Sequence, residues 1–341
     1  MNEKIAVAMS GGVDSSITAL LLKKTGWDPV GVSFKMPVWL NKNKRIINSG
    51  WKVAQKVCKD LKISHHIIDL TEEFEKTVVF YFKSELLKGR TPNPCIICNP
   101  NIKFKTLIGF ADKNKIKYVA TGHYAQLTDN FKLKIAKDIS KDQTYTLSQL
   151  PHKWLKRIVL PLGKYTKKQI YKIARENGFE FFETISQSQD FCYLKKSSLE
   201  EYIKKEIGVN KGNIFDETGQ FLGEHKGINF YTVGQRKGLL LGNGPYFVKE
   251  TNFKKNQVIV TKNKNNLLNK IVKLSDLNFF GDLKSGAVQA RIRYRHPLEE
   301  ANIQVYNKTA IVEFKKKQAV TPGQFCVFYR KDICLGSGVI N

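Results

Sequence analysis

The 341-residue sequence has no hydrophobic run long enough to cross a lipid bilayer. A transmembrane helix needs about 18 or more consecutive apolar residues, and no segment approaches that length. The first ten residues, MNEKIAVAMS, lack the charged segment and long apolar segment that mark a secretory signal. These absences predict a cytoplasmic protein without a membrane partner.

Acidic residues are scarce. There are 30 Asp and Glu against 57 Lys and Arg, which gives a formal net charge of +27. Such an excess favours a polyanionic partner, most often a nucleic acid. The chain is also rich in Lys, Asn and Ile, a bias that AT-rich coding DNA alone would produce, so the charge indicates RNA without establishing it. The six cysteines of a cytoplasmic chain are expected to be reduced, catalytic or metal-bound rather than paired in structural disulfides.

The sequence has no GxxxxGK[ST] motif, and therefore no P-loop lysine that would grip the phosphates of a nucleotide. A different phosphate-binding candidate is the string Ser10-Gly11-Gly12-Val13-Asp14-Ser15-Ser16, between an apolar strand and an amphipathic helix. Its glycines permit a tight turn, and the first turn of the helix offers N–H groups to a phosphate. We expect Asp14 to bind Mg²⁺ or to orient the loop. The alternative is an ordinary glycine turn with Ser15 as the helix N-cap.

Strands and helices alternate from residue 1 to about 125, which predicts a doubly wound parallel α/β domain. Ligands of such sheets bind beyond the C-terminal ends of the strands, where both the Ser10–Ser16 string and Gly122-His123 fall. His123 is either a structural histidine or a site residue. From about residue 205 glycines are frequent and short strands are predicted, including one at Asn229–Val233. From about 270 the pattern predicts a small barrel or sandwich.

A CxxC motif stands in Thr91-Pro92-Asn93-Pro94-Cys95-Ile96-Ile97-Cys98-Asn99. Such a motif serves as half a zinc site, a redox pair or part of a cluster site, but no second CxxC or HxxxH is present here. The prolines predict a loop from Asn93 to Asn101, before a helix from Ile102 whose positive end would favour a Cys98 thiolate. A lone cysteine such as Cys192, which follows a polar segment at 186–190, is by default a small buried apolar residue.

Two further polar segments are explained by ordinary secondary structure or an exposed loop. Lys141–Tyr145 reads as a plain exposed loop, and Lys167–Glu176 as a basic amphipathic helix.

Several segments together carry a resemblance to a known family. SGGVDSS, GRTPNPCxxCNxxIKF, ATGHYA, KDQTYxL, SQDFC, YTVGQRKGL, RYR and VTPGQ follow one another along the chain. They resemble the tRNA-specific 2-thiouridylases, the bacterial MnmA family of ATP pyrophosphatases, over residues 4–340. The resemblance implies an ATP pyrophosphatase domain with a doubly wound parallel sheet at 1–204, a small β-rich central domain at 205–268 and a tRNA-binding C-terminal β-barrel at 269–341. It also implies a tRNA-uridine 2-sulfurtransferase, which adenylates O2 of the wobble uridine U34 and replaces it with sulfur.

The resemblance further assigns site residues. Cys192 would carry a persulfide, and Cys98 would release sulfide from it or afterwards close a disulfide with Cys192. The residues that would bind ATP are Ala8, Met9, Ser10, Gly11, Gly12, Val13, Asp14, Ser15, Phe34 and Gly122. Those that would contact tRNA are Asn93, Pro94, Cys95, His123, Lys141, Asp142, Gln143, Arg293, Tyr294 and Gln324. The implied cofactors are ATP and Mg²⁺, and the implied partners are tRNA and a sulfur donor, which is a persulfide carrier, a cysteine desulfurase or sulfide.

Two departures keep alternatives open. Cys95 stands where many members of the family have Asp, so Cys95, Cys98 and Cys192 could instead hold a [4Fe–4S] cluster, as in related tRNA thiolases. The segment from Trp39 to Trp51 is basic where relatives are acidic. Other candidates are a ligase or amidotransferase acting on a small molecule, which predicts no catalytic cysteine pair, and a non-catalytic RNA-binding protein, which should have lost Asp14 or one of the two cysteines.

Overall fold

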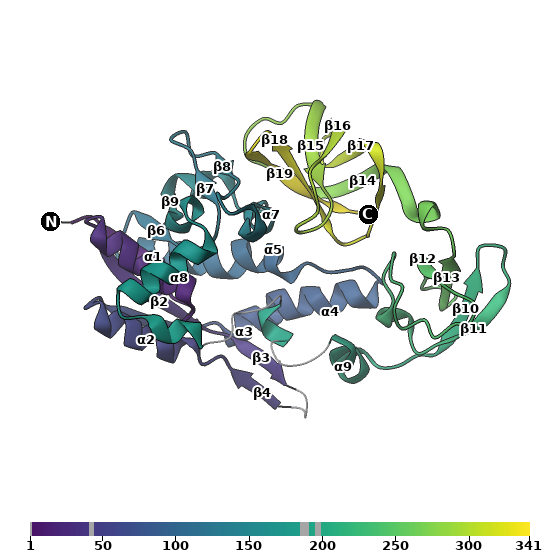
Figure 1. Cartoon of the computed structure of the whole chain (residues 1–341), viewed down its shortest axis with the longest axis horizontal. Coiled ribbons are helices and arrows are strands. Elements are labelled where there is room, and N and C mark those ends of the chain that lie inside the picture. The colour runs from purple at the N-terminus through teal and green to yellow at the C-terminus, as the bar shows by residue number, and fades with distance from the viewer. Residues whose placement is uncertain (1, 41–43, 185–190, 195–198) are drawn as a thin grey trace.

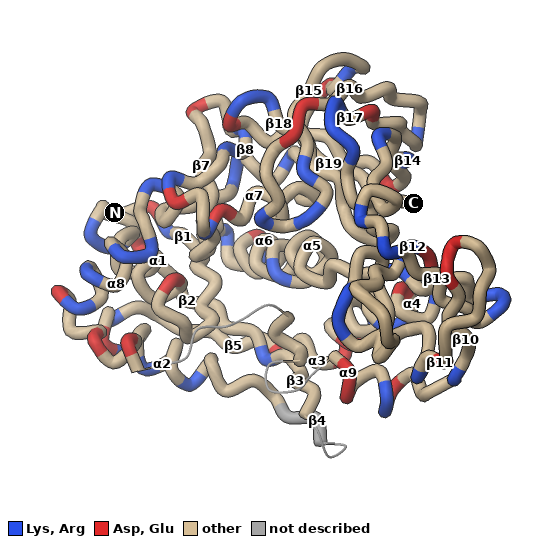
Figure 2. The backbone as a smooth tube through the Cα atoms, turned by 45° about the vertical axis from the view of Figure 1, so that its right-hand side comes forward, with Lys and Arg blue, Asp and Glu red and all other residues tan. Residues whose placement is uncertain are grey.

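The computed structural model describes residues 2–40, 44–184, 191–194 and 199–341. The polar segment predicted at 186–190 lies outside the described residues. An α/β domain forms the N-terminal part, and a small β-rich domain and a barrel follow it along the chain (Figure 1). Lys and Arg occur in all three parts rather than in one of them (Figure 2). Within the described ranges, no helix has the length and apolar character needed to cross a membrane.

The N-terminal domain is built on a five-stranded parallel sheet, as predicted. Its strands, in spatial order, are β5 (His65–Asp69), β2 (Asp28–Lys35), β1 (Lys4–Ala8), β6 (Tyr118–Ala120) and β9 (Ile158–Val159). Strand β1 is apolar throughout its interior because both faces of the sheet are covered. Ile5 and Val7 pack against α1 (Val13–Lys24), α2 (Gly50–Asp60) and α8 (Lys167–Glu176).

The opposite face of the sheet packs against two long helical segments. One consists of α3 (Thr71–Phe74), a π-helical turn (Glu75–Val79) and α4 (Phe80–Leu87). The other consists of α5 (Pro94–Cys98), a π-helical stretch (Asn99–Phe104) and α6 (Lys105–Lys113).

The prediction of a loop from Asn93 to Asn101 is therefore wrong. Asn93 is the N-cap of α5 and accepts a hydrogen bond from Ile96 N at 3.4 Å. Pro94 occupies the first helical turn, where a missing N–H costs nothing, so proline begins this helix instead of preventing it. Pro100 falls within the first two positions of the π-helical stretch. Cys98 consequently lies inside a continuous helical segment and not in front of one.

The central domain contains a four-stranded sheet in the order β11 (Phe221–His225), β10 (Gly212–Asp216), β13 (Gln257–Thr261) and β12 (Phe247–Asn252). The strand predicted at Asn229–Val233 is wrong, since Ile228–Phe230 form a 3₁₀ turn. Ile228 and Tyr231 are both buried in the domain core, and their spacing of three residues suits a 3₁₀ turn rather than a strand.

The C-terminal domain is a closed six-stranded barrel, as the resemblance implies. Its strands are β14 (Leu268–Phe279), β17 (Thr309–Ala319), β16 (Glu299–Tyr306), β15 (Gly286–Arg291), β18 (Phe325–Arg330) and β19 (Ile333–Ile340), and pairing of β14 with β19 closes it. A hairpin of the N-terminal domain, β7 (Gln126–Leu127) and β8 (Leu133–Lys134), continues the barrel sheet beyond β19. A second hairpin, β3 (Pro37–Leu40) and β4 (Lys44–Ile47), overlaps the basic Trp39–Trp51 segment.

The segment Lys141–Tyr145 forms the polar interface between the N-terminal domain and the barrel. Asp142 is buried with Arg291 of β15, at 3.7 Å between Oδ2 and Nη1. Tyr145, in α7 (Thr144–Leu147), donates its hydroxyl to Phe325 O at 2.8 Å. The reading of this segment as an exposed loop is therefore wrong, because Asp142 and Tyr145 are buried and contact the barrel.

Tyr145→Phe should lower the melting temperature by a few degrees. The substitution leaves the buried Phe325 carbonyl without its donor, which costs about 1–3 kcal/mol. The measurement is thermal unfolding followed by circular dichroism. Tyr306→Phe is the matched control, because Tyr306 is 51% exposed and its hydroxyl bonds only to Gln304 within the same strand. Equal melting temperatures for both variants would show that the bond to Phe325 does not stabilise the interface.

Candidate active site

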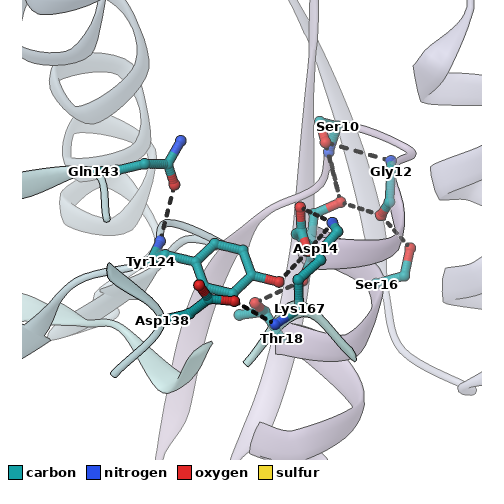
Figure 3. A network of polar contacts seen from close by, with 10 residues as sticks. Ser10, Gly12, Asp14, Ser16, Thr18, Tyr124, Asp138, Gln143 and Lys167 are labelled. Carbon is teal, nitrogen blue, oxygen red and sulfur yellow. Dashed lines mark hydrogen bonds and ion pairs between the residues drawn. The ribbon is translucent and has the colours of Figure 1, made fainter. Parts of the chain in front are cut away.

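The loop that follows β1 is held in shape by its own hydroxyl groups (Figure 3). Ser15 Oγ donates to Gly12 O at 3.0 Å and accepts from Ser10 N at 3.2 Å. Ser16 Oγ donates to the same carbonyl at 3.0 Å. Helix α1 begins at Val13 with Gly12 as its N-cap and no side-chain cap, so Ser15 is not the N-cap. The first N–H groups of α1 have no acceptor within the helix and suit a phosphate.

The remaining predicted ATP residues gather at the same edge of the sheet. A Cβ at Gly122, two residues beyond β6, would lie 2.9 Å from Asp14 C and Ser15 N, so only glycine fits there. Met9 N donates to Val32 O at 2.8 Å, which ties the start of the loop to β2. Phe34, near the end of β2, is 9% exposed.

Asp14 is the centre of a polar network that joins the loop to α8 (Figure 3). Lys167 Nζ donates to both of its carboxylate oxygens, at 2.7 and 2.8 Å, and Tyr124 Oη donates to one of them at 2.8 Å. The Lys167 side chain is 13% exposed and that of Asp14 33% exposed. Asp14 thus orients the loop. Both oxygens accept hydrogen bonds here, so a Mg²⁺ ion at Asp14 would share the carboxylate with Lys167 and Tyr124.

Lys167 was not singled out from the sequence. It is the first residue of α8, which is fixed by a capping box between Thr166 and Gln169. Its ammonium group also lies over the rings of Tyr124 and Tyr171, at 5.8 and 5.2 Å from their centroids. The sequence contains one indirect signal for such a residue. The phosphate loop itself contains no lysine, so a site for a polyanionic nucleotide needs a cation from another element.

The same network reaches the predicted tRNA-contact segment. Gln143 Oε1 accepts from Tyr124 N at 2.9 Å, and Gln143 N donates to Tyr124 O at 2.8 Å. Gln143 therefore fixes the backbone of the tyrosine that bonds to Asp14. Lys141 and Gln143 are half-buried, whereas Asp142 is buried.

The cysteines predicted to be catalytic lie in a second cluster. All six cysteines are free thiols, and Cys98 is 4% exposed, whereas Cys95 and Cys192 are half-buried. Burial raises the pKa of Cys98 to about 12, with Lys103 acting to lower it and Cys192 and Cys95 adding to the rise. The expectation that a helix end favours a Cys98 thiolate is thus wrong, because α5 begins at Pro94 and Cys98 is buried within the helical segment. Cys98 is a neutral thiol at pH 7.

Lys103 is the cation of this cluster. Burial lowers the pKa of Lys103, but its interactions with Cys98, Cys192 and Cys95 outweigh burial, and the pKa is raised overall. All three thiols therefore lie within electrostatic reach of one ammonium group, although Cys192 comes from a distant segment of the chain. The available sequence signal was a lysine between Ile102 and Phe104, both of which are buried.

His123 lies between the two clusters. Its Nδ1 is 2.8 Å from Thr121 Oγ1, and its ring stacks on Phe104 at 5.8 Å between centroids. Burial and the nearby Lys103 lower the pKa of His123 to about 3, so it is neutral at pH 7. Three consecutive residues therefore join the halves of the site: Gly122 contacts the phosphate loop, His123 lies near Lys103, and Tyr124 bonds to Asp14.

The thiols do not form a metal site as they stand. In the part of the chain that the structure describes, which includes Cys95, Cys98 and Cys192, no group of three or more His, Cys, Asp or Glu residues could hold a metal ion. As placed in this structure, the three thiols are therefore not arranged as ligands of a [4Fe–4S] cluster.

The barrel residues predicted to contact tRNA border the cysteine helix. Tyr294 is half-buried beside Tyr145, at 6.0 Å between ring centroids, and burial raises the pKa of Tyr294, with Cys95 among the charges that interact with it. Gln324 Nε2 donates to Thr91 O at 2.9 Å and to Pro92 O at 3.3 Å. Arg293 donates to Thr321 Oγ1 and, at 3.5 Å, to Val233 O of the central domain.

Comparison with known proteins covers the whole chain. Residues 3–196 match the model of the tRNA methyl transferase HUP domain, 200–262 that of the tRNA methyl transferase PRC-barrel domain, and 269–340 that of the aminomethyltransferase beta-barrel domain. A "tRNA-specific 2-thiouridylase MnmA 1" of Clostridium tetani is 39% identical over 100% of this chain and 97% of its own length. A "tRNA-specific 2-thiouridylase MnmA 2" of Thermoanaerobacter sp. is 38% identical over 100% of this chain and 98% of its own length.

Similarity to solved structures is weaker. A 4-thiouridine synthetase–RNA complex with bound ATP has a TM-score of 0.40 and 17% identity, and the match covers 57% of this chain and 46% of that one. The curated relatives, by contrast, match from end to end and at more than a third of positions. The chain belongs to the tRNA-specific 2-thiouridylase (MnmA) family.

Proposed function

We propose that this protein catalyses ATP-dependent 2-thiolation of the wobble uridine of tRNA, in the cytoplasm. One observation carries the proposal: the segment Gly122–Tyr124 joins a loop suited to phosphate to a cluster of three thiols around one lysine. A ligase acting on a small molecule needs the first half of this site but not the second. A non-catalytic RNA-binding protein needs neither.

The phosphate loop serves the activation step. O2 of uracil attacks the α-phosphorus of ATP, pyrophosphate leaves, and the base carries AMP on O2. The N–H groups at the start of α1 stabilise the negative charge that develops on the phosphates. Lys167 supplies the cation that a P-loop would carry in its own sequence, and Asp14 holds that cation beside the loop.

The exposure of the cysteines supports separate roles for them. Cys192 is half-buried, so a sulfur donor reaches it more readily than it reaches the buried Cys98. We therefore assign the persulfide to Cys192. Lys103 favours the anionic form of the sulfur in this cluster, because an ammonium group lowers the pKa of a neighbouring thiol.

The atoms and electrons of the sulfur-transfer step are accounted for by the Cys192 persulfide and the Cys98 thiol. The Cys98 thiol attacks the inner sulfur of the Cys192 persulfide, forms the Cys98–Cys192 disulfide and releases sulfide, which attacks C2 of the adenylated uridine and displaces AMP. Direct attack of the terminal persulfide sulfur on C2, followed by attack of Cys98, ends in the same disulfide. An external thiol reductant then restores both thiols, so the disulfide is a transient of the reaction and not a structural bond.

ATP is the cofactor that this site accommodates. Mg²⁺ would accompany its phosphates, and Asp14 would share its carboxylate between that ion, Lys167 and Tyr124. No step is assigned to a [4Fe–4S] cluster. The persulfide on Cys192 is proposed to come from a persulfide carrier or a cysteine desulfurase. Free sulfide, the third source implied by the resemblance, would attack C2 directly without passing through Cys192.

Cys98→Ser and Cys192→Ser should each abolish 2-thiouridine formation while tRNA binding stays within about twofold of the unmodified protein, because each removes one sulfur atom of the exchange but no positive charge. The measurements are nucleoside mass spectrometry after incubation with ATP, Mg²⁺, tRNA and a persulfide donor (a cysteine desulfurase with cysteine), and filter binding of tRNA. Cys58→Ala is the control, since Cys58 is buried against the opposite face of the sheet. Full activity of either serine variant would contradict the mechanism.

Lys167→Met should weaken ATP binding by about tenfold or more, because a charge-assisted contact contributes about 1.5–3 kcal/mol and Asp14 is left unpaired beside the phosphates. Asp14→Asn should have a smaller effect on ATP affinity, since the cation remains and the amide oxygen of Asn can still accept from Lys167. ATP affinity is measured by calorimetry and turnover by pyrophosphate release. Lys168→Met, at the exposed neighbouring position, is the matched control. An unchanged ATP affinity in Lys167→Met would exclude the proposed role.

Alkylation of Cys98 by iodoacetamide should become faster as pH rises from 7 to 9.5, by close to tenfold per pH unit, because its pKa of about 12 leaves little thiolate in this range. Lys103→Gln should slow the reaction at every pH, since it removes the cation that lowers this pKa. Peptide mass spectrometry follows the modification. A pH-independent rate, or a faster rate in Lys103→Gln, would contradict the assigned electrostatics.

A further inference from the structure

All three domains meet on the short stretch Gly89–Pro92, which we call the junction segment. It follows α4 and leads directly into Asn93, the N-cap of the helix that carries Cys95 and Cys98. Within its own domain Arg90 contacts Glu85, through N to O at 2.9 Å and Nε to Oε2 at 3.0 Å, and the other two domains supply further contacts.

The barrel supplies most of these contacts. Thr91 N donates to Pro322 O at 2.9 Å, and Arg90 donates to Ile340 O at 3.0 Å. Gln324 Nε2 donates to Thr91 O at 2.9 Å and to Pro92 O at 3.3 Å, and Gln324 itself is 9% exposed. Two carbonyl groups of the junction segment thus depend on a single amide group of the barrel.

The barrel turn is shaped for this approach. Gly323 has a φ of +88°, and a Cβ there would lie 2.9 Å from Arg90 Cβ and from Thr91 O. A side chain at this position would push the turn away from the junction segment. The backbone of Pro322–Gln324 therefore packs directly against the junction segment, in addition to the hydrogen bonds between them.

The central domain contacts the same segment from another side. The ring of Phe253, which packs against the core of that domain, lies directly over Gly89. Thr232 Oγ1 accepts from Thr91 Oγ1 at 3.5 Å. Arg293 ties the barrel turn to the central domain, through Thr321 Oγ1 and Val233 O.

We infer that Gln324 is a positioning residue for the cysteines. When tRNA binds to the central domain and the barrel, Gln324 couples the position of the barrel to that of the helix Pro94–Cys98. This inference rests on the proposed function and gives Gln324 a role different from the direct tRNA contact that the family resemblance implies. Its amide group is committed to Thr91 and Pro92, immediately before the N-cap of that helix. A movement of the barrel or of the central domain therefore shifts the start of the helix, and Cys95 and Cys98 with it.

The test compares Gln324→Ala and the nearly isosteric Gln324→Glu, which lacks the amide donor, with Gln318→Ala. Gln318 is the matched control, because it is also a buried barrel glutamine but donates to Lys316 O within its own strand. Three quantities are measured on the full-length protein: the iodoacetamide alkylation rates of Cys95 and Cys98 without tRNA, kcat and KM for tRNA thiolation, and tRNA affinity by filter binding.

Both Gln324 variants should raise the alkylation rates by about threefold or more, because the start of the helix is no longer held in place. They should lower kcat by about tenfold, with KM and tRNA affinity within twofold, since misplacement of reacting groups acts on turnover. Gln318→Ala should leave all three quantities unchanged.

Two results would overturn the inference. One is unchanged alkylation and kcat in both Gln324 variants. The other is weaker tRNA binding with unchanged alkylation and kcat, which would make Gln324 a direct tRNA contact. Failure of the proposed function is seen separately, as an unmodified protein that forms no 2-thiouridine, and the alkylation rates still report on the junction segment in that case.

Discussion

The active site depends on the close approach of the chain beyond β6 to the first turn of α1, which only a glycine at position 122 permits. Gly122 lies against Asp14 and Ser15 and Tyr124 bonds to Asp14, whereas His123, between them, lies near Lys103. Three consecutive residues thereby set the distance between the phosphate loop and the thiols. Neither half of the site could shift along the sheet without disturbing the other.

Each half of the site contains one partly buried lysine, and the partners of these lysines differ. Lys167 is paired with a carboxylate and two aromatic rings, so its charge is fixed in place. Lys103 lies near three cysteines, of which the buried Cys98 is a neutral thiol at pH 7, so an anionic sulfur formed in this cluster would compensate its charge. The first arrangement suits a phosphate chain that arrives already charged, and the second suits a sulfur atom that must acquire charge during the reaction.

Local patterns predicted those parts of the molecule that local physics decides. The parallel sheet, the phosphate loop and the helix Lys167–Glu176 follow from hydrophobic periodicity and from the strand-to-helix turn. The errors arose where one residue type permits two structures: Pro94 begins a helix as readily as it interrupts one, and apolar residues three apart at Ile228 and Tyr231 fit a 3₁₀ turn. The ion pair of Asp14 with Lys167 and the contacts of the junction segment join residues far apart in the chain, and nothing in a single sequence marks them as neighbours.

The bond between Arg90 and Ile340 spans 250 residues and has a consequence for how the protein folds. Closing a loop of that length is entropically costly, and it requires the last strand of the barrel, which emerges from the ribosome after everything else described here. The parallel sheet and the phosphate loop involve only residues made earlier, so the nucleotide half of the site is complete while the cysteine helix still lacks its anchor. The anchoring of the cysteine helix therefore depends on a strand that is synthesised 250 residues later, whereas the phosphate loop does not depend on that strand.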